Sequence, residues 1–143
     1  MKVLIKRFDK TLPIPEYKTP GAAAFDLAAR QDTQIPPGGI GYVPLNIALQ
    51  LPKDHWALLA ARSSLHKLGL MLANGIGVGD YDYRGDGDEY LAAVYNFTQQ
   101  PVLVERGERI VQMIIMSREA VELIEKDHFN TKDRGGYGST GRK

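Results

Sequence analysis

Residues 109–116 read RIVQMIIM, and this stretch decides the fold class of the chain. It is a nearly continuous apolar run that contains one amide side chain, Gln112, and residues 91–94 (LAAV) form a second such run. Runs of this length are typical of β-strands that are covered on both faces. Glycines and prolines, 15 and 8 of the 143 residues, separate the apolar runs along the chain. This punctuation predicts many short strands joined by turns.

The rest of the chain fits the same architecture. Pro44 predicts an edge strand or a bulge where it occurs, and the weak alternation of residues 2–8 is typical of a half-buried edge strand. One short helix is expected over residues 62–69, with a serine as its N-cap and Gly69 just beyond its last turn. Strands are expected at residues 2–8, 24–28, 41–51, 56–60, 91–97, 102–105, 109–116 and 120–124.

The C-terminus differs from the rest of the chain in composition. Residues 1–133 are predicted to form one all-β domain, a jelly-roll type barrel or sandwich with one short helix. Residues 134–143 (RGGYGSTGRK) are polar and glycine-rich, and they cannot form a packed element alone. We therefore expect a flexible C-terminal tail after the domain.

Charge and cysteine content exclude several classes of function. The 18 basic and 17 acidic side chains give a net charge of +1, which argues against nucleic acid or an anionic membrane as a partner. The chain has no cysteine, so disulfides, thiolate metal sites and cysteine nucleophiles are excluded. No apolar run approaches the roughly 20 residues that span a bilayer, and we expect no signal peptide. A cytoplasmic location is expected.

The densest polar segment is residues 74–86, NGIGVGDYDYRGD. Its alternating glycines expose backbone N–H and C=O groups, so a flat ligand could lie against them. Asp80 and Asp82 would project from the same face if the backbone is extended, and such a carboxylate could bind a cation or take a proton from water. The alternative is a solvated turn with acidic side chains, since Asp and Gly are typical turn residues.

Two other places could bind a ligand. Arg62, Ser63 and Ser64 stand at the N-terminus of the expected helix, where free N–H groups, hydroxyls and a guanidinium could hold a phosphate. The alternative there is a serine cap beside an arginine in a salt bridge. Gln112 is either a buried structural amide or a donor to a ligand. The histidines lack the spacing of a metal site and are expected at the surface: His55, His66 and His128.

Five segments, in the order in which they occur along the chain, resemble the trimeric deoxyuridine triphosphate diphosphatase (dUTPase) family, and together they extend over nearly the whole chain. The pattern Asp-x-Asp-Tyr-Arg-Gly and the terminal aromatic-Gly-Ser-Thr-Gly are specific when they occur together. The five segments are residues 21–27 (GAAAFDL), 62–65 (RSSL), 74–85, 107–113 (GERIVQM) and 134–141 (RGGYGSTG).

The resemblance implies a jelly-roll fold and a homotrimer with three shared active sites. It also implies hydrolysis of dUTP to dUMP and pyrophosphate, which keeps uracil out of DNA and supplies dUMP for thymidylate synthesis. The implied cofactor is Mg²⁺, held mainly by the substrate phosphates and by no protein ligand directly.

By the same resemblance, Asp80 orients and deprotonates the attacking water, and the ring of Tyr83 packs under the deoxyribose and excludes a 2′-hydroxyl. Asn74 matches the uracil-binding amide, and the backbone around Gly77 reads the base edge. The ring of Tyr137 covers the base. The remaining implied residues are Arg62, Ser63, Ser64 and Gln112 at the phosphates, Arg134, Gly138 and Ser139 in the tail, and Asp26 and Asp82 in supporting positions.

The body of the chain departs from the family pattern at three places. Gly79 stands where the family usually has a branched apolar residue, which predicts a looser strand. Residues 85–90 form a segment about three residues longer than usual, which adds the acidic side chains of residues 86–89 near the site. Ser64 replaces a common glycine.

The tail departs from the pattern as well. Arg134 precedes Tyr137 by three residues, where the family typically has five. Arg142 or Lys143 could therefore contact the γ-phosphate in place of Arg134.

Three alternatives to dUTP hydrolysis are open. A dCTP deaminase of the same fold would carry a glutamate three residues before Asn96, and this chain has Ala93 there. A non-catalytic nucleotide-binding protein would keep the fold, although the intact Asp80, Tyr83 and Gln112 argue against it. A sugar-binding jelly roll would need exposed aromatic platforms, and the aromatic residues lie mostly in strands or motifs.

Overall fold

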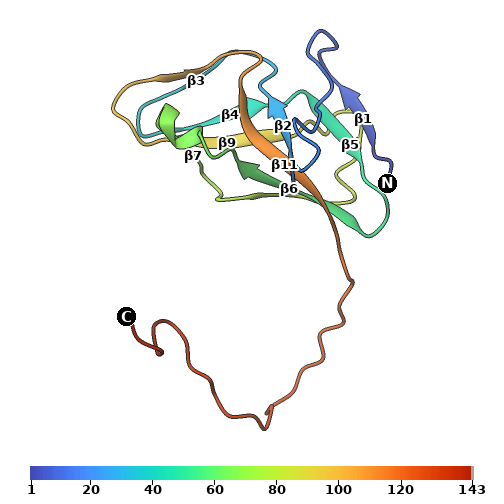
Figure 1. Cartoon of the computed structure of the whole chain (residues 1–143), viewed down its shortest axis with the longest axis vertical. Helices are drawn as coiled ribbons and strands as arrows, with labels where there is room; N and C mark the ends of the chain where they lie inside the picture. The colour runs from blue at the N-terminus through green and yellow to red at the C-terminus, as the bar shows by residue number, and fades with distance from the viewer. Residues whose placement is uncertain (143) are drawn as a thin grey trace.

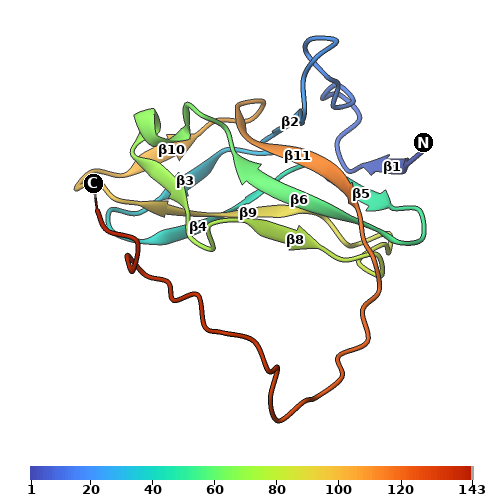
Figure 2. The ribbon, with the colours of Figure 1, turned by 60° about the horizontal axis from the view of Figure 1, so that its bottom comes forward.

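Eleven β-strands and one 3₁₀ helix make up the body of the chain in a computed structural model that describes residues 1–142 (Figure 1). Beyond the last strand the chain leaves the body as an extended segment, which Figure 2 shows from a second side. The elements are β1 (Leu4–Arg7), β2 (Phe25–Ala28), β3 (Thr33–Ile35), β4 (Ile40–Pro44), β5 (Ile47–Gln50), β6 (His55–Ala61), η1 (Leu65–Leu68), β7 (Leu70–Leu72), β8 (Gly77–Gly79), β9 (Leu91–Asn96), β10 (Val102–Val104) and β11 (Arg109–Ser117).

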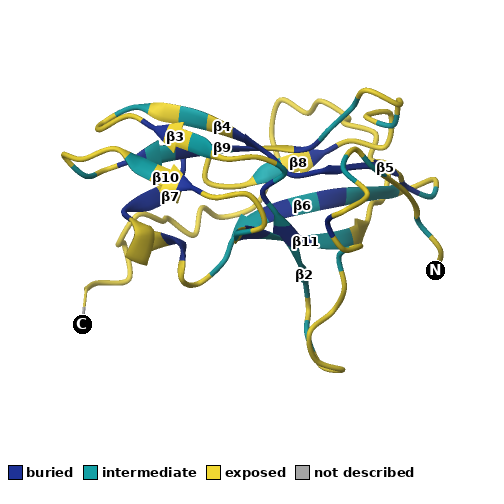
Figure 3. Cartoon of the chain, turned by 90° about the horizontal axis from the view of Figure 1, so that it is seen from above, coloured by how far each residue is buried: buried dark blue, intermediate teal, exposed yellow. Residues whose placement is uncertain are grey.

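The strands form two main antiparallel sheets. The larger sheet has the strand order β2-β11-β6-β8, and the smaller has the order β4-β9-β7. Two short pairs, β1 with β5 and β3 with β10, complete the strand pairing. Burial of apolar side chains between sheets stabilises such a sandwich, and Figure 3 shows how burial is distributed over the strands. The predicted all-β, jelly-roll type fold is confirmed. The largest fully buried side chains are Leu27, Ile35, Val43, Leu45, Ile47, Leu51, Leu70, Val94, Val104, Ile110, Val111 and Met113.

The two apolar runs of the sequence form the central strands of the two sheets. In β11, Ile110 and Val111 are consecutive and both buried, but the pairing with β2 shifts register between Arg109 and Val111, so simple alternation between faces does not hold there. Further along the strand Met113 is buried while Ile114 is half-buried, so the expected cover of both faces is incomplete. In β9, Leu91 is 48% exposed while Ala92 is fully buried. The prediction of two covered faces is therefore wrong for β9, because among the described residues no further layer covers the outer face at Leu91.

A buried asparagine divides the strand that was expected over residues 41–51. β4 lies at the edge of its sheet and ends with Pro44, as predicted. Asn46 then takes a φ of +70°, a conformation that Asn adopts more readily than most residues. The side-chain NH₂ of Asn46 donates to the Asp9 carbonyl (3.0 Å), and the side-chain oxygen of Asn46 accepts from the Asp9 N–H (2.6 Å). The chain thereby leaves one sheet at β4 and pairs with β1 as β5.

Several local predictions are corrected by the structure. The expected helix is a single 3₁₀ turn, and Ser64 makes no side-chain capping bond, although Gly69 ends the turn at a φ of +77° as expected. The strands β3, β7 and β8 were not predicted, and each has only three residues. The strand expected over residues 120–124 does not form, because no strand in residues 1–142 pairs with this segment. In the described residues, no helix is long and apolar enough to cross a membrane.

Candidate active site

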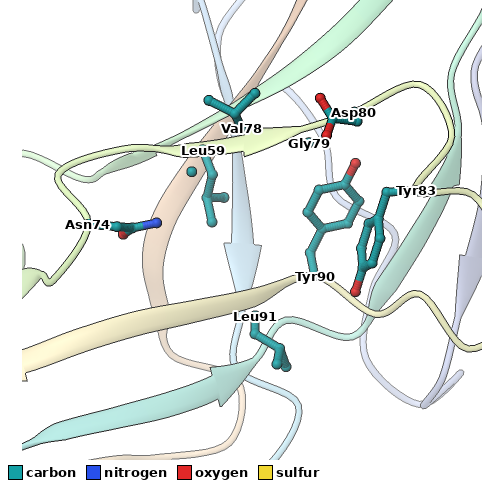
Figure 4. Close-up of a pocket in the computed structure, with 9 residues that line it drawn as sticks. Leu59, Asn74, Val78, Gly79, Asp80, Tyr83, Tyr90 and Leu91 are labelled. Atoms are coloured by element: carbon teal, nitrogen blue, oxygen red, sulfur yellow. The ribbon is translucent and has the colours of Figure 1, made fainter.

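A cavity of about 310 Å³ lies between β8 and the start of β9 (Figure 4). Its volume is at the lower end of the range for small-molecule sites. Two walls come from opposite sheets, because β8 is the edge strand of the larger sheet and β9 is central in the smaller. Its lining residues are Leu59, Asn74, Gly77, Val78, Gly79, Asp80, Tyr83, Tyr90 and Leu91.

Asn74 and Asp80 lie at opposite ends of β8, so the strand itself spans the cavity. Asn74 stands in the tight turn before the strand, where Gly75 has a φ of +72° and the Ile76 N–H donates to the Asn74 carbonyl (2.8 Å). At the other end the Asp80 side chain is exposed. An amide and a carboxylate are thus presented to the same space.

The backbone turns immediately after Asp80. The Tyr83 N–H donates to the Asp80 carbonyl at 3.2 Å, which closes a β-turn over these four residues. The extended geometry that would put Asp80 and Asp82 on one face is therefore absent, and Asp82 does not line the cavity. The turn instead brings Asp80 and Tyr83 together.

Tyr83 is held by contacts on two sides. Its hydroxyl donates to the Glu89 carbonyl (2.8 Å), and its ring meets the Tyr90 ring edge-on with centroids 5.4 Å apart and an interplanar angle of 84°. Burial raises the pKa of Tyr83, and the Asp88 and Glu89 carboxylates raise it further. The hydroxyl therefore stays protonated as a donor, and the ring is fixed at the cavity wall.

The acidic insertion, residues 86–89, anchors this wall. The Glu89 carboxylate accepts from Arg30 Nε and Nη2 at 2.7 and 3.0 Å, and from the Asn46 N–H at 2.9 Å. The Asp88 carboxylate accepts from the Gly85 N–H at 2.6 Å, which closes the loop on itself. Such charge-assisted bonds are stronger than neutral ones. The insertion thus fixes the residues that flank Tyr83 and Tyr90.

Gly79 makes room for an aromatic ring. A Cβ at this position would lie 2.5 Å from the Tyr90 hydroxyl and 2.6 Å from Tyr90 Cε1. The prediction of a looser strand is wrong, because Tyr90 fills the space and β8 keeps its register with β6. Gly77 is also closely packed, since a Cβ added at this position would lie 3.0 Å from Leu59 Cβ. These two glycines serve close packing against Leu59 and Tyr90.

A second group of polar side chains gathers where β2, β6 and β11 meet. Asp26 is only 13% exposed and pairs with Arg62 Nε and Arg109 Nη1, both at 3.1 Å. Arg62 also donates to the Arg109 carbonyl (2.8 Å). The amide of Gln112, which faces Asp26 across the sheet, donates to the Ala61 carbonyl (3.0 Å). Arg62 is thus in the salt bridge that was the alternative to phosphate binding.

Comparison with known proteins shows the family of this chain. The model of the dUTPase family matches residues 10–141 of the chain. The chain belongs to the dUTPase family. Its relatives named deoxyuridine 5′-triphosphate nucleotidohydrolase include those of Dictyoglomus turgidum, 40% identical over 99% of both chains, and Desulfitobacterium hafniense (strain DSM 10664 / DCB-2), 43% identical over 99% of this chain and 95% of the relative. The crystal structure of the dUTPase from Streptococcus mutans is similar with a TM-score of 0.77 and 32% identity, covering 82% of this chain and 98% of that one.

The residues expected from the dUTPase resemblance fall into three groups in the single chain. Asn74, Gly77, Asp80 and Tyr83 line one cavity. The group around Arg62 does not line it, and neither do the exposed Ser63 and Ser64. The third group lies on the extended segment beyond β11 (Figure 2). Every described residue of the tail is exposed, and the group consists of Arg134, Tyr137, Gly138, Ser139 and Arg142. Lys143 lies outside the described residues.

Sequence reasoning missed part of this cavity. Leu59, Val78, Tyr90 and Leu91 line the cavity but were not singled out. The signals that could have found Tyr90 are Gly79, where the resemblance predicts a branched apolar residue, and residues 85–90, which the resemblance predicts to be shorter and which end at Tyr90. Arg109 was also missed as the second partner of Asp26.

The acidic residues of the site do not form a metal cage. In residues 1–142, no group of three or more His, Asp or Glu side chains is arranged to hold a metal ion. Asp80 is the one carboxylate among the cavity-lining residues. This donor set fits a Mg²⁺ that takes most of its ligands from substrate phosphates and water.

Proposed function

We propose that this dUTPase-family chain hydrolyses dUTP to dUMP and pyrophosphate with Mg²⁺ in the cytoplasm. The observation that carries the proposal is one cavity in which an amide, an exposed carboxylate and a fixed tyrosine ring meet: Asn74, Asp80 and Tyr83. These are the residues that the family motifs assign to the base, the water and the sugar. When bound, Mg²⁺ supplies positive charge at the phosphate oxygens.

Asp80 is the proposed general base. Its exposed carboxylate stands at the rim of the cavity, where water and a phosphate chain can both reach it. A carboxylate that accepts a proton from water makes the oxygen a better nucleophile for in-line attack on phosphorus. The turn from Asp80 to Tyr83 holds this carboxylate next to the sugar site.

Tyr83 and Asn74 provide the proposed selectivity. The Tyr83 ring cannot move away easily, because Glu89 and Tyr90 hold it, so it leaves no room for a 2′-hydroxyl. The Asn74 amide and the β8 backbone can pair with the 4-carbonyl of uracil. Cytosine has an amino group there, and the unpaired polar groups would give discrimination of about 10⁴. The close packing of Gly77 on Leu59 is consistent with exclusion of the thymine methyl.

A homotrimer is the proposed form of the enzyme. The phosphate-binding candidates Arg62, Ser63, Ser64 and Gln112 and the tail residues do not reach the cavity within one chain. We propose that neighbouring subunits bring these groups together, with Tyr137 covering the base. Asp26 would then act by orienting the Arg62 guanidinium toward the phosphates.

The proposed function is tested with a panel of four nucleotides. The protein is incubated with dUTP, dCTP, dTTP or UTP plus Mg²⁺, with a chelator as the matched control, and pyrophosphate and ammonia are followed. We expect pyrophosphate from dUTP alone, and only with Mg²⁺. Ammonia from dCTP would instead identify a deaminase. Binding of dUTP without pyrophosphate would identify a non-catalytic nucleotide-binding protein.

A further inference from the structure

The hydroxyl of Tyr90 is buried without a hydrogen-bond partner. Tyr90 is 6% exposed, and among the described residues its hydroxyl is the one buried side-chain polar atom that makes no hydrogen bond. Leaving a buried donor unpaired is costly, and most such atoms in folded proteins find a partner. A phenylalanine would fill the same volume without this cost, so the hydroxyl needs an explanation.

Tyr90 reaches its position through the gap that Gly79 leaves. Its hydroxyl lies 2.5 Å from the place that a Cβ at position 79 would occupy. Gly79 directly precedes Asp80 in the chain. Figure 4 shows the ring rising from the start of β9 toward β8, with its hydroxyl pointing toward Gly79 and Asp80. Both Tyr90 and Asp80 line the cavity.

The protonation of Tyr90 makes it a donor at neutral pH. The pKa of Tyr90 is raised to about 12, chiefly by burial and to a lesser extent by the neighbouring Tyr83, Asp80 and Asp88. Asp80, when ionised, can only accept hydrogen bonds. A donor and an acceptor that line one cavity suit an oxygen that both accepts and donates, which describes a hydroxyl group or a water molecule.

We propose that the Tyr90 hydroxyl is a further substrate-positioning group, donating a hydrogen bond to a hydroxyl-type oxygen that Asp80 also contacts. This inference rests on the proposed function. Two sources of that oxygen fit the chemistry: the 3′-hydroxyl, which is the free sugar hydroxyl of dUTP, and the water that Asp80 activates. The competing interpretation is that Tyr90 only fills the space beside Gly79, in which case its ring matters and its hydroxyl does not.

The variant Tyr90→Phe separates these interpretations, because it keeps the ring and removes only the hydroxyl. Steady-state kinetics are measured with dUTP and with 2′,3′-dideoxyuridine triphosphate, and thermal unfolding is measured without nucleotide. Tyr42→Phe is the matched control, since Tyr42 is 65% exposed and lies on the edge strand β4. We expect Tyr90→Phe to lower kcat/KM for dUTP by about tenfold, with an unchanged or higher melting temperature.

The pattern of loss identifies the oxygen. A loss confined to dUTP and seen in KM assigns the bond to the 3′-hydroxyl, and an equal loss on both nucleotides seen in kcat assigns it to the water. Unchanged kinetics on both nucleotides, or a loss accompanied by a lower melting temperature, overturns the proposal. If the wild type releases no pyrophosphate, the proposed function fails on its own. Calorimetric binding of the non-hydrolysable α,β-imido analogue of dUTP to wild type and Tyr90→Phe then decides the contact, and equal affinity overturns it.

Discussion

Asp80 is the one carboxylate in a cavity whose other side chains are apolar, amide or aromatic. We expect Asp80→Asn to lower turnover of dUTP by about 100-fold or more, because an amide cannot accept the proton from water. Nucleotide binding and folding should stay near normal, since the side chain is exposed. Pyrophosphate release and calorimetric binding measure the two effects. Asp54→Asn is the control, because Asp54 has a φ of +59° that Asn also accepts. Near wild-type turnover would remove Asp80 from the mechanism.

Tyr83 is proposed to select the sugar, because its ring fills the space that a 2′-hydroxyl would need. Tyr83→Ala opens the space that a 2′-hydroxyl needs, so we expect the ratio of UTP to dUTP hydrolysis to rise by about tenfold or more. Tyr81→Ala is the neighbouring control, because the Tyr81 ring packs against Arg84 and does not line the cavity. An unchanged ratio would mean that sugar selection lies elsewhere.

Tyr90 also predicts how stability changes in alkali. Its pKa is raised from 10.0 to about 12 in the folded chain, so the folded state holds its proton longer than the unfolded state. The free energy of unfolding is therefore unaffected by this group below pH 10.0 and falls as the pH rises toward about 12, because ionisation is easier in the unfolded chain. Tyr90→Phe should therefore weaken the loss of stability in this window, which urea unfolding at a series of pH values measures. Equal pH dependence in both proteins would contradict the assignment. Part of the pH dependence of stability should remain in Tyr90→Phe, because the pKa of Tyr83 is also raised.

The extended segment is the element with the clearest division between stability and activity. Because its described residues are exposed and make no strand or helix, deleting residues 134–143 should leave thermal stability almost unchanged. Catalysis should fall by about 100-fold, since a lid that covers bound nucleotide excludes water and fixes the triphosphate. Steady-state kinetics and melting curves on the truncated protein test both parts.

Single variants within the tail refine this test. Tyr137→Phe should be mild, because the ring is expected to stack on the base, and Tyr137→Ala should reproduce part of the deletion. Full activity after deletion would remove the lid from the mechanism, and a large fall in melting temperature would show a structural tail.

The strands show what local sequence can and cannot predict. The apolar run of β11 was correctly interpreted as a strand and the proline of β4 as an edge-strand signal, because strand propensity and the missing proline N–H act locally. Cover of both faces of β11 was not predictable in this way, because it depends on what packs against the strand. β3, β7 and β8 are too short to produce a period. Residues 120–124 have the side chains of a strand, but a strand also needs a partner, which local pattern does not specify.

The candidate site also contains residues that the sequence could predict and residues that it could not. Asn74, Asp80 and Tyr83 could be placed from a resemblance in one continuous segment, and the structure brings them to one cavity. Tyr90 could not, because its role depends on meeting Gly79 across two strands from different sheets. Asp82 was misplaced because the extended backbone ends at Gly79. Contacts between distant segments are thus the part that sequence alone left out.

For the molecule as a whole, we expect a homotrimer with a mass near three times the 15.8 kDa of the chain. The three groups of site residues are separate in one chain, and the exposed apolar side chains beyond β11 would be covered in an assembly: Val121, Leu123, Ile124 and Phe129. Light scattering measures the mass, and the activity of each separated species is assayed alongside. A fully active monomer would contradict the shared site.

The tail is joined covalently to the body by the extended segment that begins after Ser117, and this attachment has a kinetic consequence. A flexible segment joined to its target holds its end group at an effective concentration in the millimolar range, whatever the dilution of the protein. Closure over the nucleotide is then a unimolecular event within each assembly. The enzyme would keep its lid at the lowest concentrations in a cell, and only dissociation of the subunits would take it away.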